Sequence, residues 1–358
     1  MNEIQITGLE DLGFGGFNET ELGESDLLKH TVARVVSEYR EAYKVRSING
    51  EYLAKITGKQ QFLAVKREDY PAVGDFVLIN ELSPGKAVIH RVLPRKNILR
   101  KKYSNREENQ LIATNIDTAF IVGSPDKDYS LNRFERYFVI ARDGGINPVI
   151  IINKTDLISE AELQTKLNEL KGRLGGVEVL LTSTVTDSGL NELEKYITRG
   201  KTYCFLGSSG VGKSTLINKL LGKNEIKTME VSETTGRGKH TTSAREMYFL
   251  KNGGIVIDNP GTREVGTGDS ATGMENVFEE IRLLSQSCRY TDCTHTNEPG
   301  CAILEAVEAG TLDKDKYANY IKLRKEAEFY EMGEVERRAK DRKFGKFIKK
   351  AKEGLEKY

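Results

Sequence analysis

The segment GSSGVGKST at 207–215 matches G-x-x-x-x-G-K-[ST], the pattern of loops that bind phosphate groups. An apolar segment, TYCFL, precedes it and a helical pattern, STLINKLLG, follows, which is the context such a loop needs. Glycines let backbone N–H groups turn toward phosphate oxygens, and the helix N-terminus adds its positive dipole end. Lys213 is predicted to reach the β- and γ-phosphates and Ser214 to bind Mg²⁺. The residues predicted to hold the phosphates are Gly207, Ser208, Ser209, Gly210, Val211, Gly212, Lys213, Ser214 and Thr215.

The segment NKTD at 153–156 carries the side chains that a guanine base requires. Asp156 can accept hydrogen bonds from the two donors on the Watson–Crick edge of guanine, where adenine presents only one donor. Asn153 is predicted to brace this loop, Lys154 to lay its stem over the base, and Thr155 to complete the loop. In a later Thr-Ser-Thr segment, Ser183 is predicted to offer its backbone N–H to the guanine carbonyl, although an ordinary turn explains that segment equally well. The set predicts a site for GTP.

A third segment, DNPG at 258–261, follows the apolar run GIVI. Asp258 is predicted to hold the Mg²⁺ shell through water, and Gly261 to contact the γ-phosphate. In the preceding run TTGRGKHTTSARE, Thr242 or its neighbour Thr241 is predicted to complete the Mg²⁺ shell.

No glutamine occurs between 231 and 285 to orient the attacking water, so intrinsic hydrolysis is predicted to be slow. His240 is predicted to take that role, the alternative being that it packs or contacts RNA. The predicted catalytic residues are Lys213, His240 and Asp258.

The order of the three segments is unusual. In most GTPases the phosphate loop comes first, then D-x-x-G, then N-K-x-D; here NKTD precedes the phosphate loop, which precedes DNPG. The loops need only meet at one edge of a sheet, and domain termini often lie close enough to be joined. The order therefore predicts a circularly permuted domain, in which the segment after DNPG runs directly into the C-terminal region.

That region contains CRYTDCTHTNEPGC at 288–301, with the spacing C-x₄-C-x-H-x₅-C. Three thiolates and one imidazole suit tetrahedral Zn²⁺, and four protein ligands leave no open position, so the predicted site is structural. Its ligands are Cys288, Cys293, His295 and Cys301, the alternative being buried thiols beside a chance histidine. Cys204 stands apart and is interpreted as a core thiol.

The elements that position these residues follow from hydrophobic periodicity. Short alternating runs from 31 to 93, separated by turn signals such as Asn49-Gly50, predict a small barrel of the OB type. From about 107, apolar β-branched runs alternate with amphipathic helical stretches, which predicts a parallel sheet covered on both faces. After about 270 the pattern is mainly helical. The predicted domains are an acidic extension (1–29), an OB-like barrel (30–100), the permuted GTPase domain (107–268) and a helical zinc-binding domain with a basic C-terminal helix (269–358).

Charge is balanced over the 358 residues, with a formal net charge of +1, but it is unevenly distributed. Residues 86–106 hold eight basic residues and no acid, which predicts contact with a polyanion through Arg95, Lys96, Lys101 and Lys102. The alternative is a solvated connector. Residues 1–30 hold seven acids and one lysine and are expected to be a loosely ordered lead-in with a short helix near Leu9–Leu12. No segment resembles a signal peptide or a membrane span, so we expect a cytoplasmic protein.

The barrel, the permuted order with GRGKHTT at 236–242, and CRYTDCTHTNEPGC together resemble the RsgA/YjeQ family of GTPases that depend on the small ribosomal subunit. The resemblance covers about 30–350 and implies a late assembly factor for that subunit, slow alone and stimulated by it. It also implies that the barrel and zinc domain contact 16S ribosomal RNA, with Mg²⁺ accompanying GTP and GDP. We expect a monomer. Thr262 departs from the apolar residue that commonly follows D-x-P-G in the family.

Two other functions remain open from the sequence. An RNA-binding protein could use GTP as a structural or conformational ligand without turnover, although Lys213, Ser214 and Asp258 argue against this. A signalling or membrane-associated GTPase is disfavoured because no lipidation motif is present.

Overall fold

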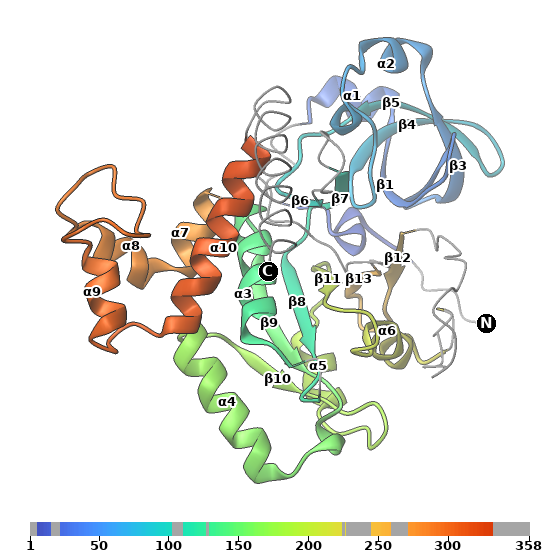
Figure 1. Ribbon diagram of the computed structural model, residues 1–358. Coiled ribbons are helices and arrows are strands. Elements are labelled where there is room, and N and C mark those ends of the chain that lie inside the picture. Colours follow the sequence, from blue (N-terminus) through green and yellow to red (C-terminus); the bar gives the residue numbers. More distant parts are fainter. Residues whose placement is uncertain are drawn as a thin grey trace, which may run out of the picture. The chain divides into compact units, whose positions relative to one another are not determined.

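Figure 1 shows the computed structural model, which describes residues 6–15, 22–101, 110–126, 129–223, 226, 245–258 and 271–331. The chain divides into two units, Met1–Gly266 and Thr267–Tyr358. The predicted boundaries at 30, 107 and 269 stay predictions at the level of single residues.

The first part of the larger unit is a closed barrel of five strands. Its strands are β1 (Thr31–Glu38), β2 (Tyr43–Ser47), β3 (Gly50–Ile56), β4 (Phe76–Ser83) and β5 (Lys86–Val92), with helix α2 (Gly58–Leu63) between β3 and β4. They are ordered β1-β2-β3-β5-β4, and β4 pairs back with β1 to close the barrel. Alternate side chains point inward, as Tyr43 and Val45 do in β2, because successive residues of a strand face opposite sides. The predicted OB-like barrel is confirmed.

The second part is a sheet ordered β10-β9-β8-β11-β13-β12. Its strands are β8 (Thr118–Gly123), β9 (Asn147–Ile152), β10 (Val179–Leu181), β11 (Thr202–Leu206), β12 (Glu246–Phe249) and β13 (Ile255–Asp258). All neighbours are parallel except β12, which runs antiparallel to β13. Every residue of β8 and β11 is buried, which explains their uninterrupted apolar sequences.

Helices connect these strands as the amphipathic stretches predict: α3 (Leu131–Asp143), α4 (Glu160–Leu174), α5 (Leu190–Tyr196) and α6 (Lys213–Leu221). Helix α4 begins at a capping box, in which the Ser159 hydroxyl and the Glu162 carboxylate satisfy each other's backbone N–H groups. Helices α3 and α4 are joined by a buried ion pair between Glu135 and Arg173, whose atoms lie 2.7 Å apart.

A buried arginine joins the barrel to the sheet. Arg34 of β1 is fully buried and donates to the carbonyl oxygens of Leu12 (2.6 Å) and Asn115 (3.0 Å), and to the Thr202 hydroxyl (2.9 Å) at the start of β11. Burial lowers the pKa of Arg34 to about 10, which leaves the guanidinium charged at neutral pH. Strand β1 also pairs with β12 at Ser37 and Glu246, so the barrel and the sheet share a continuous ladder.

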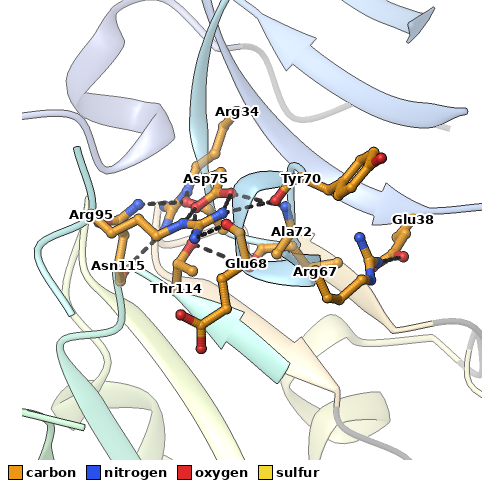
Figure 2. Close-up of polar contacts among 12 residues, drawn as sticks. Arg34, Glu38, Arg67, Glu68, Tyr70, Ala72, Asp75, Arg95, Thr114 and Asn115 are labelled. Atoms are coloured by element: carbon orange, nitrogen blue, oxygen red, sulfur yellow. Dashed lines mark hydrogen bonds and ion pairs between the residues drawn. The ribbon is translucent and has the colours of Figure 1, made fainter. Parts of the chain in front are cut away.

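Beside Arg34 lies an ion pair between Asp75 and Arg95 (Figure 2). The Arg95 guanidinium binds both oxygens of the wholly buried Asp75 carboxylate at 2.8 and 2.7 Å, and also donates to the carbonyl oxygens of Glu68 and Tyr70. Asp75 also accepts from the Thr114 hydroxyl at 2.6 Å. Arg95, which the sequence assigns to RNA, therefore holds the segment after β5 against the turn before β4, and Asp75 connects that turn to Thr114 at the end of strand β7 (Gln110–Thr114).

In residues 6–15, the described part that precedes Leu22, the N-terminal segment differs from the loosely ordered lead-in that its composition predicts. A 3-10 helix does form at Leu9–Leu12, as expected. Leu12 and Phe14, however, are buried against barrel residues such as Phe76. Asp11 is held by the backbone N–H of Thr7 and by Arg199, and these contacts lower its pKa to about 2. The acidic composition of this segment gave no sign that Leu12 and Phe14 are buried.

The described part of the smaller unit is mainly helical, with a loop between α8 and α9, which confirms the helical C-terminal region. Its helices are α7 (Ala271–Val277), α8 (Glu279–Ser285), α9 (Ala302–Glu308) and α10 (Lys314–Glu331). The predicted basic helix at the C-terminus falls mostly beyond Glu331, outside the described residues.

Removing Asp75 should destabilise the first unit. Asp75→Ala leaves Arg95 without its carboxylate and the Thr114 hydroxyl without its acceptor, and breaking a buried pair costs about 3–5 kcal/mol. Urea unfolding would measure the loss. As a control, Arg91→Ala breaks the exposed pair with Asp26 and should cost at most about 1 kcal/mol. Equal midpoints for the two variants would contradict the structural role of Asp75.

Candidate functional site

Three of the predicted motifs meet at one edge of the parallel sheet, where the strands end. NKTD follows β9, the Thr-Ser-Thr segment follows β10, and the phosphate loop follows β11 and opens α6. Neighbouring parallel strands place their carboxyl ends together, and ligands of open α/β sheets bind there. Asp258 ends β13, the strand beside β11. The topology thus assembles in space a set of residues that lies in permuted order along the chain.

The phosphate loop has the backbone geometry that its glycines predict. Gly207 has φ 145°, and a Cβ there would lie 2.3 Å from the Val122 carbonyl oxygen. Gly212 has φ 97°, and its Cβ would lie 2.3 Å from the amide nitrogen of Asn153. Lys213 is nearly buried and its ammonium donates to the carbonyl oxygens of Gly207 (2.8 Å) and Ser208 (2.7 Å). The ammonium is therefore held against the backbone of the loop that is predicted to bind the phosphates.

Asn153 connects the three loops. This fully buried side chain donates from its amide nitrogen to the carbonyl oxygen of Val211 in the phosphate loop (2.9 Å). Its amide oxygen accepts from the Thr182 hydroxyl (3.1 Å) in the loop after β10. The predicted bracing role is thus visible as two hydrogen bonds. Thr182 belongs to the Thr-Ser-Thr segment that was predicted to offer backbone N–H groups to guanine, but the contact of its hydroxyl with Asn153 was not predicted.

The carboxylate predicted to recognise guanine is held by a serine. The Ser183 hydroxyl donates to Asp156 at 2.5 Å and accepts from the backbone N–H groups of Val185 and Thr186. Lys154 adopts a left-handed backbone conformation (φ 62°), and the 3-10 turn Thr155–Leu157 follows it. Ser183 was predicted to act through its backbone N–H, but that group donates to the Ser188 carbonyl oxygen. The contact between Ser183 and guanine remains a prediction, and the serine's visible role is to orient Asp156.

Two of the residues predicted to hold Mg²⁺ lie near the same edge. Ser214 is in the first turn of α6, the nearly buried Asp258 ends β13, and α6 packs against β13. Hydroxyl and carboxylate oxygens are ligands that Mg²⁺ accepts, so these two side chains fit the metal that a GTPase uses with its nucleotide. Thr242, His240 and Gly261 fall outside the described residues, and their roles stay predictions.

One contact at the phosphate loop had no signal in the sequence. Arg133, in the first turn of α3, donates to the Ser208 hydroxyl at 3.2 Å. Neighbouring residues of that turn fix the helix, because Asn132 and Glu135 both accept from Arg173 of α4. A single arginine in an amphipathic helix gives no hint of this contact, since the two partners lie far apart along the chain.

The four predicted zinc ligands converge in the smaller unit. Cys288, Cys293, His295 and Cys301 place one ligand atom each within 4.8 Å of the others. The imidazole Nδ1 lies 3.6 Å from the sulfurs of Cys288 and Cys301, which are 3.9 Å apart. Sulfur and nitrogen ligands at about 2.3 and 2.05 Å from a tetrahedral Zn²⁺ would lie about 3.5–3.8 Å from one another. The group therefore fits a metal of this kind.

The pKa values of the cluster make metal binding dependent on pH. Burial lowers the pKa of His295, which favours the neutral imidazole that a metal binds. Desolvation and the adjacent thiols raise the pKa of Cys293 to about 11, so without a metal this thiol keeps its proton. The loop is held by Glu298, which accepts from the backbone N–H groups of Thr294 (2.9 Å) and Thr296 (3.0 Å). Metal binding would release thiol protons and strengthen at higher pH.

The residues predicted to contact RNA have different surroundings. Arg95 is used within the chain, as described above, and Lys96 is half exposed with its ammonium 3.0 Å from Asp117. Lys101 ends strand β6 (Ile98–Lys101), but its side chain and the whole of Lys102 fall outside the described residues. Among the helices described, none has the length and apolar character needed to cross a bilayer.

The proteins that this chain resembles are GTPases, in agreement with the nucleotide site described above. The family model described as RsgA GTPase matches residues 92–268. The chain is 40% identical to "Small ribosomal subunit biogenesis GTPase RsgA 2" of Lactiplantibacillus plantarum, covering 86% of this chain and 87% of that protein. It is 37% identical to "Small ribosomal subunit biogenesis GTPase RsgA 1" of Bacteroides thetaiotaomicron, covering 98% and 97%. The chain belongs to the RsgA GTPase family and is a GTP hydrolase.

Solved structures agree in fold. The crystal structure of YjeQ from Thermotoga maritima superposes with a TM-score of 0.60 at 28% identity, covering 82% of this chain and 97% of that one. YloQ, described as a circularly permuted GTPase, superposes with a TM-score of 0.59 at 23% identity, covering 85% and 97%. The predicted fold class and family resemblance are confirmed.

Asp156→Asn should change which base is bound. The amide can donate where the carboxylate only accepts, so GTP should bind about ten- to a hundredfold more weakly. Xanthosine triphosphate, which offers a carbonyl in place of the amine, should bind better than to the wild type. Ser183→Ala, which removes the hydroxyl that holds Asp156, should weaken GTP without improving the xanthosine nucleotide. Competition binding measures both, and an unchanged preference in Asp156→Asn would contradict the assignment.

Cys288→Ser should release the metal and unfold part of the smaller unit, because metal-binding energy contributes to folding there. We expect loss of stoichiometric zinc by elemental analysis and faster proteolysis beyond 267, with nucleotide binding retained. Cys204→Ala is the matched control, since this buried thiol lies in β11 outside the cluster. Protein purified without chelator that holds no zinc would remove the claim.

Proposed function

We propose that this protein is a GTPase that binds the small ribosomal subunit and assists its late maturation. The observation that carries the proposal is the extent of similarity: relatives named small ribosomal subunit biogenesis GTPase align over nearly the whole chain. The similarity therefore includes the barrel and the metal cluster as well as the nucleotide site. The partner is the subunit with its 16S ribosomal RNA, and the reaction converts GTP to GDP and phosphate.

The residues of the site have distinct tasks in this reaction. Asp156, oriented by Ser183, binds the guanine edge, while Lys213 neutralises charge on the β- and γ-phosphates. Ser214 and Asp258 would hold Mg²⁺, Ser214 directly and Asp258 through water, and the ion would supply positive charge near the phosphate oxygens. Asn153 keeps the base-binding and phosphate-binding loops in register.

RNA contact is assigned to the barrel and to the segment that follows its last strand, β5. Lys96, Lys101 and Lys102 stay candidates for phosphate contacts, whereas Arg95 anchors the stretch to which they belong. We assign Zn²⁺ to the four-residue cluster as a structural ion. The protein is proposed to act as a monomer in the cytoplasm, where ribosomal subunits are assembled.

The proposal is tested by co-sedimentation with purified small subunits. The protein should pellet with subunits when loaded with a non-hydrolysable GTP analogue and far less with GDP, and subunits should accelerate phosphate release. Lys213→Ala should lose nucleotide-dependent binding. Subunit binding without any phosphate release would favour the alternative, an RNA-binding protein that uses GTP as a conformational ligand. No binding in either state would refute the proposal.

His240→Ala should separate binding from chemistry. If the imidazole positions the attacking water, the variant keeps GTP and subunit binding but loses about a hundredfold of the subunit-stimulated rate. Lys239→Ala, one residue away in the same run, is the matched control and should keep the rate. A wild-type rate in His240→Ala would assign the role to another residue or to the ribosome.

A further inference from the structure

Helix α2 of the barrel is unusual because it buries none of its side chains. The last two residues of the helix, Phe62 and Leu63, are exposed, Phe62 to 88%. Val65, just after the helix, is also 88% exposed. Figure 1 shows α2 at the top of the barrel, between β3 and β4 in the chain. Three large apolar side chains therefore face water on one short segment, which we call the α2 patch (residues 58–66).

The patch is held to the barrel through its backbone. The Thr57 hydroxyl caps the helix by accepting from the Gln60 N–H (3.2 Å), and the Thr57 N–H donates to the Ile89 carbonyl oxygen of β5 (3.2 Å). At the other end, the Asp69 carboxylate accepts from the N–H groups of Val65 (2.8 Å) and Lys66 (2.7 Å). The segment is thus fixed in place while its apolar side chains stay out of the core, and such an exposed apolar group commonly marks a contact site.

The α2 patch is surrounded by basic residues, which favour a negatively charged partner. Residues 52–67 include four basic residues and no acid. Lys55, Lys59 and Lys66 are exposed, and within the described part of the chain no salt bridge involves them. The fourth base, Arg67, is paired with Glu38, and the next acid, Glu68, is paired with Arg100. Asp69, which accepts from the Lys66 N–H, adds one negative charge at the end of the segment. The apolar side chains therefore stand among three lysines and one nearby carboxylate, an excess of positive charge.

We propose that the α2 patch is a docking surface for single-stranded RNA, with an unpaired base stacked on Phe62 and neighbouring phosphates on Lys59 and Lys66. An exposed aromatic ring among lysines provides both parts of such a site, because base stacking is indifferent to sequence and lysines follow the backbone. This inference rests on the proposed function, in which RNA is the partner. It adds a site in the barrel that is separate from the basic stretch 86–106.

Charge also argues against a second copy of this chain as the occupant. A symmetric contact places the same patch on both partners, so lysines would face lysines across it. The same repulsion applies to a basic protein.

The chain contains no tryptophan, so Phe62→Trp provides a single fluorescent reporter in the patch. A short single-stranded oligoribonucleotide should quench its emission, because the indole stacks on a base. A duplex of the same sequence should not, because its bases are already stacked and paired. Leu28→Trp is the matched control: Leu28 is 87% exposed but lies in helix α1 (Glu24–Lys29), outside the acid-free segment. Equal quenching of the two reporters, or none with the single strand, would overturn the proposal.

Affinity measurements separate stacking from charge. Phe62→Ala should weaken binding of the oligoribonucleotide by about ten- to a hundredfold without changing its salt dependence. Lys59→Gln should lower the log–log salt slope by about 0.7, the value for one phosphate contact on a single strand. Because Phe62 is almost fully exposed, its removal leaves the fold intact, which circular dichroism verifies. Wild-type affinity in Phe62→Ala would overturn the proposal.

Two further outcomes identify other occupants and distinguish this inference from the proposed function. A concentration-dependent dimer that Phe62→Ala converts to a monomer, seen by sedimentation velocity, would overturn the RNA site in favour of a second copy. Quenching of Phe62→Trp by small subunits but not by the oligoribonucleotide would overturn it in favour of a ribosomal protein. If wild-type protein fails to bind subunits at all, the proposed function falls, while the oligoribonucleotide titration still decides this site.

Discussion

The nucleotide site depends on a buried amide. Asn153 donates to the phosphate loop at Val211 and accepts from Thr182, so one side chain fixes the positions of three loops from three strands. A buried amide with one partner missing would cost about 1–3 kcal/mol, so all three loops have to be in place together. This requirement is spatial and says nothing about chain order. A permuted sequence can therefore satisfy it, as long as the strands return to the same positions in the sheet.

A second constraint lies where the barrel meets the sheet. The Arg34 guanidinium donates to groups from the N-terminal segment, from the connection to β8 and from β11, the strand that runs into the phosphate loop. A charge buried this deeply destabilises the fold unless its N–H donors have hydrogen-bond acceptors. If the barrel moved away from β11, the Arg34 guanidinium would either become exposed to water or stay buried without its hydrogen-bond partner Thr202. The barrel and the strand that runs into the phosphate loop are thus linked through this contact, in addition to the pairing of β1 with β12.

Much of the site was readable from the sequence because its motifs are local: the spacing within NKTD and within GSSGVGKST already fixes their geometry, and the Cys and His spacing predicts the metal cluster. The strands were readable from periodicity. Long-range contacts left no such signal. Arg95 was assigned to a basic stretch because the sequence does not show that it pairs with Asp75, which lies 20 residues earlier, just before β4. Arg34 lies among apolar residues of β1, on the face that packs against the N-terminal segment and not on the face that lines the barrel, and Leu12 and Phe14 lie in a segment rich in acids.

The permuted strand order also determines how the sheet is completed during synthesis. Strand β8 pairs with β9 on one side and with β11 on the other, but β8 ends at Gly123 and β11 begins only at Thr202. A nascent chain that has made β8, β9 and β10 therefore presents the open edge of a wholly apolar strand, which invites pairing with other chains. Insertion of β11 closes that edge and brings the phosphate loop into place in the same event. The edge of β11 in turn stays open until β13 pairs with it, so the phosphate loop is in place before the sheet is complete and before Asp258 joins the site.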